Sequence, residues 1–270
     1  MLATHNLTIR FGGHVAVNGV TCAFAPGTLT AIVGPNGAGK TTYFNLISGQ
    51  LKASAGSVRL GGPLGGQDLT ALSPSARTRA GLGRAFQLTN LFPHLSVLEN
   101  VRLAVQATQG GAHRRGLNLW SIWSDHRHLT ERAESILRSV ALFERRDTPV
   151  ASLPHGDQRK LEVALLMALE PQVYMFDEPT AGMSHDEAPV ILNLIRELKK
   201  DKTKIILLVE HKMEVVRELA DRIIVLTNGT LVADGAPAEV IASPVVQEAY
   251  LGISKDADKD ADKEAEKEAA

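Results

Sequence analysis

One short stretch constrains this 270-residue chain more than any other. It reads GPNGAGKTT, residues 34–42, and it directly follows the apolar run LTAIV. A glycine, four variable residues and then Gly-Lys-Thr is the spacing of a phosphate-binding loop, provided that a strand precedes it and a helix follows. The next residues, KTTYFNLISG, have helical spacing and end at a glycine, so both conditions are met. The pattern predicts a strand, a phosphate loop and a helix, in that order.

The loop residues have the chemistry to bind the phosphates of a nucleotide. Glycine lets successive backbone N–H groups turn inward around phosphate oxygens, and the N-terminus of the following helix adds a positive field. Lys40 is expected to reach the β- and γ-phosphates, and Thr41 to offer its hydroxyl to Mg²⁺. The predicted nucleotide contacts are Gly34, Pro35, Asn36, Gly37, Ala38, Gly39, Lys40, Thr41 and Thr42.

A second segment, VYMFDE at residues 173–178, suits the other half of such a site. Its apolar residues predict a buried strand that ends at Asp177. In open α/β sheets, ligands bind beyond the carboxyl ends of the strands, where this aspartate would lie. Asp177 is therefore a candidate Mg²⁺ ligand, and Glu178 is placed to polarise an attacking water. An acidic pair is weak evidence alone, but strong evidence downstream of a phosphate loop.

The rest of the pattern predicts an α/β core. The strand patterns HNLTI and VTCAF precede the loop, and GSVRL follows its helix. Helical spacing dominates from about residue 96 to residue 141. Strands and helices then alternate, which favours a parallel sheet with helices on both faces. The dipeptide Asn228-Gly229 predicts a β-hairpin.

Composition narrows the functional classes. The net charge of −1 argues against a general nucleic-acid binder. The single cysteine, Cys22, cannot form an internal disulfide, so we expect a cytosolic location. The N-terminus lacks the apolar segment of a signal peptide. The longest apolar run, VALLMAL, is far shorter than the roughly 18 residues of a membrane helix, so a membrane role would act through a partner.

Two segments differ from this pattern. Residues 255–270 are of low complexity, carry a net charge of −3 and contain no aromatic or branched side chain, so we expect a disordered charged tail at 254–270. Residues 112–128 hold both tryptophans among basic residues, which suits contact with a membrane partner or lipid headgroups. A loop that caps the helical region is an equally good interpretation of that segment. Its HRH sequence lacks a third metal ligand.

Together these residues resemble the ATP-binding subunits of ABC transporters over residues 1–253. The resemblance implies a P-loop NTPase (RecA-like) core with a small antiparallel β-subdomain and an inserted α-helical subdomain at about residues 88–165. It implies ATP and Mg²⁺ as ligands. GRAFQ resembles the family's Q-loop, so Gln87 is the implied sensor of Mg²⁺ and water. LLVEH resembles the switch region, so His211 is the implied γ-phosphate contact, and Phe11 matches the aromatic that stacks on adenine.

The segment LPHGD lies where this family has its Leu-Ser-Gly-Gly-Gln signature, which serves the ATP bound by the opposite subunit of a head-to-tail pair. Its residues are Leu153, Pro154, His155, Gly156 and Asp157. Pro154 stands where serine is usual, Asp157 where glutamine or glutamate is usual, and Ser184 where the D-loop usually has aspartate. Gly156 keeps the freedom for close approach of a phosphate. We therefore expect a weakened signature that also begins a helix.

Longer stretches, such as GRAFQLTNLFPHLSVLENV and DEPTAGMS, are similar to the ATPases of branched-chain amino acid importers and their amide and urea relatives. This similarity implies a peripheral subunit at the cytoplasmic face of the cell membrane. Its implied partners are a second ATPase subunit, two membrane permeases and an external substrate-binding protein, with no nucleic acid. An alternative is a soluble ABC ATPase that assembles a partner complex, as in iron–sulfur cluster assembly. A P-loop GTPase is disfavoured because no Asn-Lys-x-Asp motif is visible.

Overall fold

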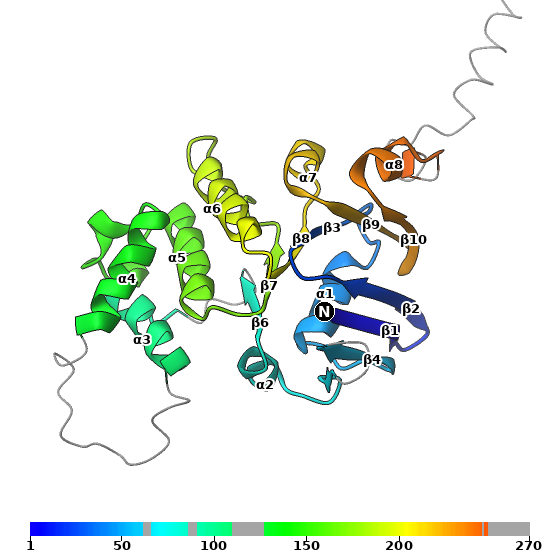
Figure 1. Ribbon diagram of the computed structural model, residues 1–270, viewed down its shortest axis with the longest axis horizontal. Coiled ribbons are helices and arrows are strands. Elements are labelled where there is room, and N and C mark those ends of the chain that lie inside the picture. The colour runs from blue at the N-terminus through cyan, green and yellow to red at the C-terminus, as the bar shows by residue number, and fades with distance from the viewer. Residues whose placement is uncertain (62–65, 86–90, 110–126, 245, 248–270) are drawn as a thin grey trace, which may run out of the picture.

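The computed structural model describes residues 1–61, 66–85, 91–109, 127–244 and 246–247. Figure 1 shows two β-sheets with a group of helices beside them. The larger sheet has the strand order β10-β9-β3-β8-β7-β6, and the smaller sheet has the order β2-β1-β4-β5. The larger sheet comprises β3 (Leu29–Val33), β6 (Leu82–Ala85), β7 (Val173–Asp177), β8 (Ile205–Val209), β9 (Arg222–Thr227) and β10 (Thr230–Gly235). The smaller sheet comprises β1 (Leu2–Phe11), β2 (His14–Phe24), β4 (Ala55–Leu60) and β5 (Gln67–Asp68).

The larger sheet is parallel apart from one edge strand. β3 pairs in parallel with both β8 and β9, and β7 pairs in parallel with β6 and β8. β10 returns antiparallel to β9 through Asn228 and Gly229, whose φ angles are 50° and 74°. Two consecutive residues at positive φ are what a tight hairpin turn of the right twist requires. The predicted parallel core and hairpin are confirmed.

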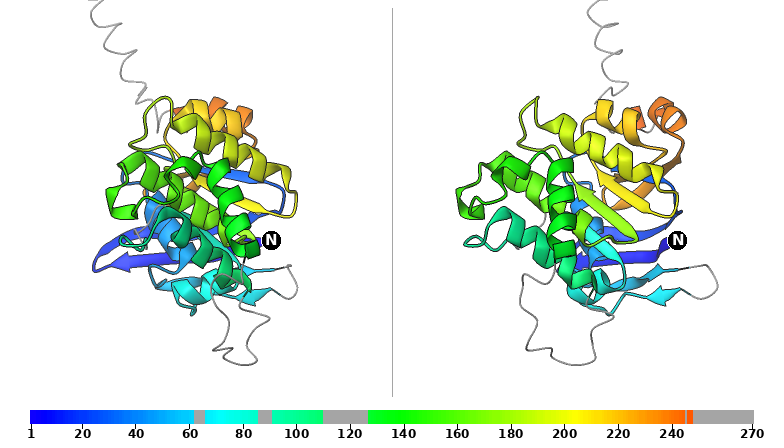
Figure 2. Two further views of the ribbon diagram at one scale, coloured as in Figure 1. Left: turned by 90° about the vertical axis from the view of Figure 1, so that its left-hand side faces the viewer. Right: turned by 60° about the vertical axis from the view of Figure 1, so that its left-hand side comes forward.

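The helices cover both faces of this sheet. They are α1 (Lys40–Ser48), α2 (Pro74–Arg79), α3 (Val97–Gln109), α4 (Arg127–Ser139), α5 (His155–Ala168), α6 (Ala188–Lys200), α7 (Met213–Leu219) and α8 (Pro237–Ala242), with short 3₁₀ turns η2 (Phe143–Arg145) and η3 (Val150–Ser152). Figures 1 and 2 place α1 between the two sheets and α5 and α6 on the opposite side of the larger sheet.

Alternation along the central strands explains these layers. In β8 every side chain is buried, as expected for a parallel strand covered on both faces. Ile206 and Leu208 join the core formed with α5 and α6, whereas Leu207 and Val209 join the core formed with α1 and the smaller sheet. Successive side chains of a strand point to opposite faces, so one apolar run contributes to both cores.

The helices α3, α4 and α5 form the helical subdomain of the fold. Their apolar faces share one buried cluster, which includes Val101 of α3, Leu137 of α4 and Leu161 of α5. The same cluster continues to Phe176 of β7, so this subdomain packs directly on the parallel sheet. The predicted combination of RecA-like core, antiparallel β-subdomain and helical subdomain is confirmed.

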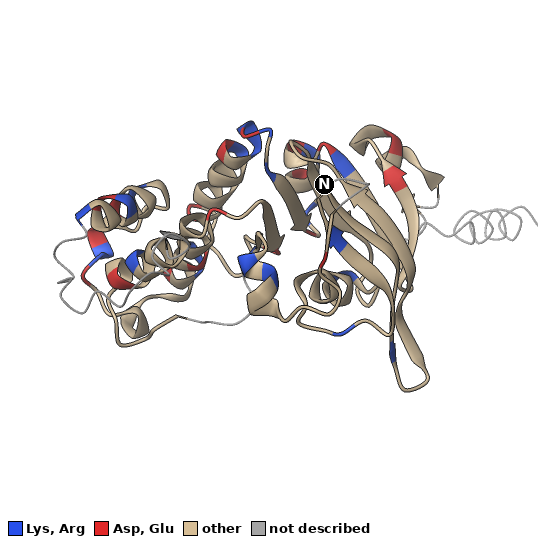
Figure 3. Ribbon diagram, turned by 60° about the horizontal axis from the view of Figure 1, so that its bottom comes forward, with Lys and Arg blue, Asp and Glu red and all other residues tan. Residues whose placement is uncertain are grey.

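Charged residues lie mainly on the helices rather than on the central strands. Figure 3 shows acidic and basic residues of both signs along the helices, whereas the interior strands are largely uncharged. Strand β6 is an exception, because Arg84 lies within it. In the part of the chain that the structure describes, no helix has the length and apolar character needed to cross a membrane. The tail 254–270 and most of segment 112–128 lie outside the described residues.

Candidate active site

The phosphate loop joins β3 to α1 and is shaped by the strands around it. A Cβ atom on Gly34 would lie 2.1 Å from the carbonyl oxygen of Leu226, and one on Gly39 would lie 2.5 Å from that of Ala16. Both glycines have positive φ, 151° and 92°, which other residues rarely adopt. The chain therefore needs glycine here for backbone contacts within the protein as well as for phosphate binding.

Lys40 is the first residue of α1 and its ammonium group lies within the loop. Nζ donates to the carbonyl oxygens of Gly34 at 2.6 Å and Pro35 at 3.0 Å. Burial lowers the pKa of Lys40, while the carboxylates of Glu178 and Asp177 oppose that shift. Gly39 precedes the helix without a capping side chain, so the first N–H groups of α1 remain available to an anion.

Asp177 ends β7 and is paired with a cation that sequence reasoning missed. Its Oδ2 lies 2.7 Å from a guanidinium nitrogen of Arg84, and the two side chains are 11% and 7% exposed. The second terminal nitrogen of Arg84 donates to Asn45 and Ser48 of α1, at 2.6 Å and 2.9 Å. Arg84 thus joins the strand before residues 86–90 to the phosphate-loop helix and to the predicted metal ligand.

Glu178 and His211 come together at the ends of neighbouring strands. Glu178 follows β7 and has a φ of 49°, and its N–H donates to Val209 of β8 at 2.9 Å. His211 follows β8, and its Nδ1 lies 3.8 Å from a Glu178 carboxylate oxygen. Both side chains are about half exposed, at 44% for Glu178 and 53% for His211. Two of the predicted catalytic groups therefore share one solvent-accessible position.

Glu210 is a buried residue that connects the segments carrying Glu178 and His211. Its carboxylate is 1% exposed and accepts from the N–H of His211 at 2.8 Å and from the Thr180 hydroxyl at 3.1 Å. The carboxylate thereby links the segment after β8 to the segment after β7. A glutamate that ends an apolar strand, as in LLVE, is the sequence signal that could have identified it.

The remaining predicted contacts lie in different places. Thr41 is exposed and Thr42 is partly buried in the first turn of α1. Phe11 ends β1 and is 50% exposed, which leaves its ring available for stacking. Gln87 lies outside the described residues.

The donors near the loop suit Mg²⁺. The Thr41 hydroxyl and the Asp177 carboxylate are oxygen donors, which this hard cation prefers, and Mg²⁺ commonly uses one or two protein ligands together with substrate phosphates. In the described residues, no group of three or more histidine, cysteine, aspartate or glutamate side chains could hold a metal alone. The oxygen donors of Thr41 and Asp177 fit a Mg²⁺ ion that is shared with nucleotide phosphates.

The signature-like segment opens α5, on the far side of the sheet from α1 (Figure 1). Leu153 is buried in the helical core, and Pro154 precedes the helix without a capping hydrogen bond. His155 is exposed and Gly156 is buried. The space that a side chain of Gly156 would occupy is filled by Glu187, whose Oε1 would lie 2.5 Å from an added Cβ. The predicted helix start is confirmed, and Gly156 lies against the Glu187 carboxylate, a contact that the sequence did not reveal.

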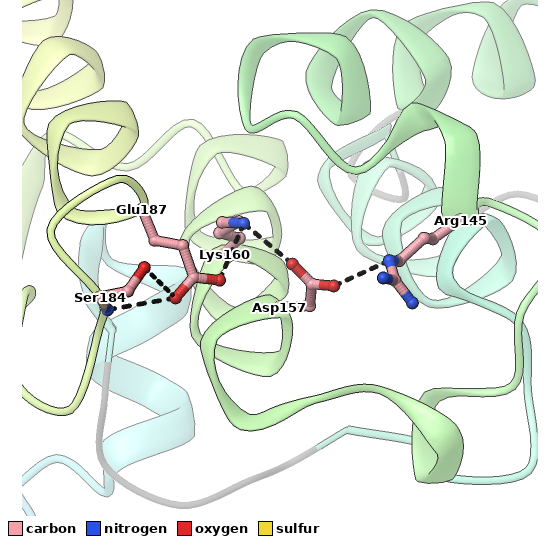
Figure 4. Close-up of polar contacts among 5 residues, drawn as sticks. All are labelled: Arg145, Asp157, Lys160, Ser184 and Glu187. Atoms are coloured by element: carbon pink, nitrogen blue, oxygen red, sulfur yellow. Dashed lines mark hydrogen bonds and ion pairs between the residues drawn. The ribbon is translucent and has the colours of Figure 1, made fainter.

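Asp157, which departs from the family signature, is fully paired. Its Oδ1 lies 2.9 Å from Lys160 Nζ, and its Oδ2 lies 2.9 Å from Arg145 Nε. Lys160 continues to Glu187 at 3.2 Å, and Glu187 accepts from the N–H of Ser184 at 3.2 Å and from its hydroxyl at 3.1 Å. Figure 4 shows these five residues as one continuous row. Sequence reasoning missed Arg145, Lys160 and Glu187, because no local pattern shows which charges will meet across the fold.

Comparisons with known proteins agree with this geometry. A family model described as ABC transporter matches residues 17–181, and one described as branched-chain amino acid ATP-binding cassette transporter matches residues 230–255. The chain is 36% identical over 253 residues to the high-affinity branched-chain amino acid transport ATP-binding protein LivG of Escherichia coli K12, covering 93% of this chain and 98% of that protein. The probable LivG of Archaeoglobus fulgidus is 33% identical over 253 residues, with 93% and 95% covered.

Solved structures give the same result. A nucleotide-free ATP-binding cassette from an ABC transporter superposes with a TM-score of 0.75 at 29% identity, covering 93% of this chain and 98% of that one. A cassette in its ADP conformation superposes equally well, with the same score, identity and coverage. The chain belongs to the ABC transporter family and is an ABC-type ATPase. Within that family it is an ATP-binding protein of the branched-chain amino acid, LivG-like, type.

Proposed function

We propose that this chain is the ATP-hydrolysing subunit of an importer for branched-chain amino acids or related amides. The family model at residues 230–255 and the two LivG relatives support this substrate class, because each names branched-chain amino acids. The substrate-binding groups would lie on other subunits, so this chain supplies the energy rather than the selectivity. The single observation that carries the hydrolytic role is the position of Glu178, which lies 3.8 Å from His211 and close enough to Lys40 for its carboxylate to oppose the lowering of the lysine pKa by burial.

The roles at the site follow from its geometry. Residues 34–42 would hold the phosphates, with the N–H groups of the loop and the Lys40 ammonium neutralising their charge. Phe11 would stack on the adenine. Thr41, Asp177 and Gln87 would hold Mg²⁺, which supplies charge neutralisation at the β- and γ-phosphates when bound. Glu178 would accept a proton from the attacking water, and His211 would contact the γ-phosphate.

The signature-like residues Leu153, Pro154, His155, Gly156 and Asp157 would face a nucleotide on a second subunit. Support comes from the fold, since the N-terminus of α5 and the phosphate loop of the same chain lie on opposite sides of the larger sheet (Figure 1). A head-to-tail pair would bring the two surfaces together. We further propose two membrane permeases and an external binding protein as partners, at the cytoplasmic face of the membrane. The tail at 254–270 and a helical subdomain at about 88–165 complete the proposed organisation.

Substitution of Lys40 and Glu178 tests the catalytic roles. Lys40→Ala should weaken ATP binding, because the ammonium contacts phosphates in the ground state. Glu178→Gln should keep ATP affinity and lower the turnover at least about 100-fold, because a general base acts only on the water. Nucleotide titration and phosphate release measure the two effects. Glu197→Gln is the matched control, since Glu197 is exposed and pairs with Lys200 inside α6. Wild-type hydrolysis by Glu178→Gln would remove Glu178 from this role.

The alternative, a soluble ABC ATPase that assembles a partner complex, predicts different partners. The transport proposal predicts co-purification with membrane permeases and ATP-dependent uptake of leucine into vesicles that contain the whole complex. Arginine serves as the competing substrate, because an arginine transport ATP-binding protein of Bacillus subtilis is also similar, at 28% identity over 252 residues. Uptake of arginine but not leucine would reject the substrate class. Recovery of soluble assembly partners without permeases would favour the alternative.

A further inference from the structure

The row of charges beside the signature-like segment joins parts of the chain that are far apart in sequence. Arg145 belongs to η2, Asp157 and Lys160 to α5, and Glu187 directly precedes α6 (Figure 4). Two cations alternate with two carboxylates along this row, so each charge has an opposite neighbour. Because each has neighbours of opposite charge, the two central members, Asp157 and Lys160, can lie only 9% and 10% exposed.

Lys160 is the central member of the row. Its side chain is 10% exposed and contacts Asp157 at 2.9 Å and Glu187 at 3.2 Å. Burial alone would lower the pKa of Lys160, but the hydrogen bonds that its ammonium donates to Asp157 and Glu187 raise this pKa above the ordinary lysine value. The ammonium is therefore charged at all physiological pH values and holds two carboxylates together.

Glu187 connects Lys160 to the segment that begins at Glu178. That segment, residues 178–187, begins at the N–H of Glu178, which is fixed to Val209 at 2.9 Å. It ends at Glu187, whose Oε2 accepts from the N–H and the hydroxyl of Ser184. The Glu187 carboxylate also lies against Gly156, where an added Cβ atom would lie 2.5 Å from Oε1. Both ends of the segment are thus attached, one to the sheet and the other to α5.

We propose that Lys160 is a positioning residue for ATP hydrolysis, which holds the 178–187 segment against the N-terminus of α5 through Glu187 and Asp157. This inference rests on the proposed role of Glu178 as the residue that activates water. The link makes Glu178 and the signature-like segment move as one unit, although they belong to the core and the helical subdomain. Loss of the link would misplace groups that act on the transition state without removing a contact to the ground-state nucleotide.

Replacement of Lys160 in the full chain tests this proposal. Lys160→Met should lower kcat about three- to tenfold and change the KM for ATP less than about twofold, because only positioning is lost. Lys160→Arg keeps the charge and should restore most of the rate. Glu187→Gln removes the charge that Lys160 contacts, and the double variant should be no slower than the slower single variant, because both changes break one link. Lys200→Met is the matched control, since it breaks an exposed pair within α6.

Four outcomes would overturn the proposal. They are a Lys160→Met rate equal to that of Lys200→Met, a Lys160→Arg rate as low as that of Lys160→Met, multiplied losses in the double variant, and a loss expressed in KM alone. If Lys160→Met does not fold, as judged by thermal unfolding, Glu187→Gln and Lys160→Arg decide the question. Glu178→Gln is measured in parallel. Loss of turnover in that variant together with an unchanged Lys160→Met rate rejects the positioning role alone and leaves the proposed function intact.

Discussion

Arg84 is a buried cation in a short strand whose other side chains are apolar or absent. Its guanidinium donates to Asp177, Asn45 and Ser48 and lies 5.0 Å from the centre of the Phe44 ring. Burial lowers the pKa of Arg84 and Asp177 opposes that shift, but an arginine remains charged in either case. Arg84 therefore fixes the position of the Asp177 carboxylate, which is the proposed Mg²⁺ ligand.

Loss of this cation should be costly. Arg84→Met leaves the Asp177 carboxylate buried without its partner, so we expect the free energy of unfolding to fall by about 3 kcal/mol. Arg84→Lys should lie between this variant and the wild type, because an ammonium cannot reproduce the planar fork. Arg132→Met is the control, since its pair with Glu170 is about half exposed at both ends, and it should cost less than about 1 kcal/mol. Urea unfolding measures all three. Equal effects for Arg84→Met and Arg132→Met would contradict the assignment.

The sequence identified the residues that belong to local motifs and missed those that meet only in three dimensions. Lys40, Asp177 and Glu178 could be predicted because one strand or one loop determines where each lies. Arg84 and Glu187 could not, because their partners are encoded tens of residues away. A charged residue within an otherwise apolar strand was the available signal for Arg84, and it was visible in LGRA.

The start of α5 combines two opposed effects of one proline. Pro154 has φ −57° and ψ 155° and precedes the first helical residue, His155. It offers no side chain to the free N–H groups of the first turn, whereas serine at this position typically stabilises a helix by about 1 kcal/mol. Proline compensates by restricting the unfolded chain, which contributes about 0.4–1 kcal/mol. The two contributions nearly cancel, so proline here has little net cost for stability.

Pro154→Ser can therefore report on function rather than on folding. We expect the free energy of unfolding to change by less than about 1 kcal/mol. In the assembled transporter, ATPase activity should rise roughly two- to tenfold, because the new hydroxyl can donate to the γ-phosphate on the opposite subunit. ATP affinity of the isolated chain should not change. A lower or equal rate would mean that the proline is adapted to this site, and a changed affinity in the isolated chain would argue against the head-to-tail arrangement.

Helices and strands with a clear pattern of apolar residues could be predicted from the sequence, but the elements that they pack against could not. The strands β3, β7 and β8 follow from continuous apolar runs, and the β9–β10 hairpin follows from Asn228-Gly229. Their order in the sheet does not, because β3 pairs with β8 and β9, which come about 180 residues later. The prediction that α3, α4 and α5 form one subdomain is based on the family resemblance rather than on periodicity.

The C-terminal residues give a prediction about the molecule as a whole. Deletion of residues 255–270 should leave the ATPase rate and the melting temperature unchanged, because a segment without aromatic or branched side chains buries little surface. Calorimetry and phosphate release on the shortened and full chains would measure this. A drop of several degrees in the melting temperature would show that these residues dock on the folded domain.

The phosphate loop is supported by backbone groups that are synthesised long after it. Gly34 lies against Leu226, and Ala38 accepts a hydrogen bond of 3.0 Å from the N–H of Gly229, whose carbonyl in turn accepts from Asn18 at 2.8 Å. These contacts of Gly34 and Ala38 are therefore complete only after the β9–β10 turn has been synthesised. At ribosomal rates of 5–20 residues per second, that interval lasts about 10–40 s. A nascent chain that ends before this turn presents the phosphate loop to ATP without the backbone contacts from Leu226 and Gly229.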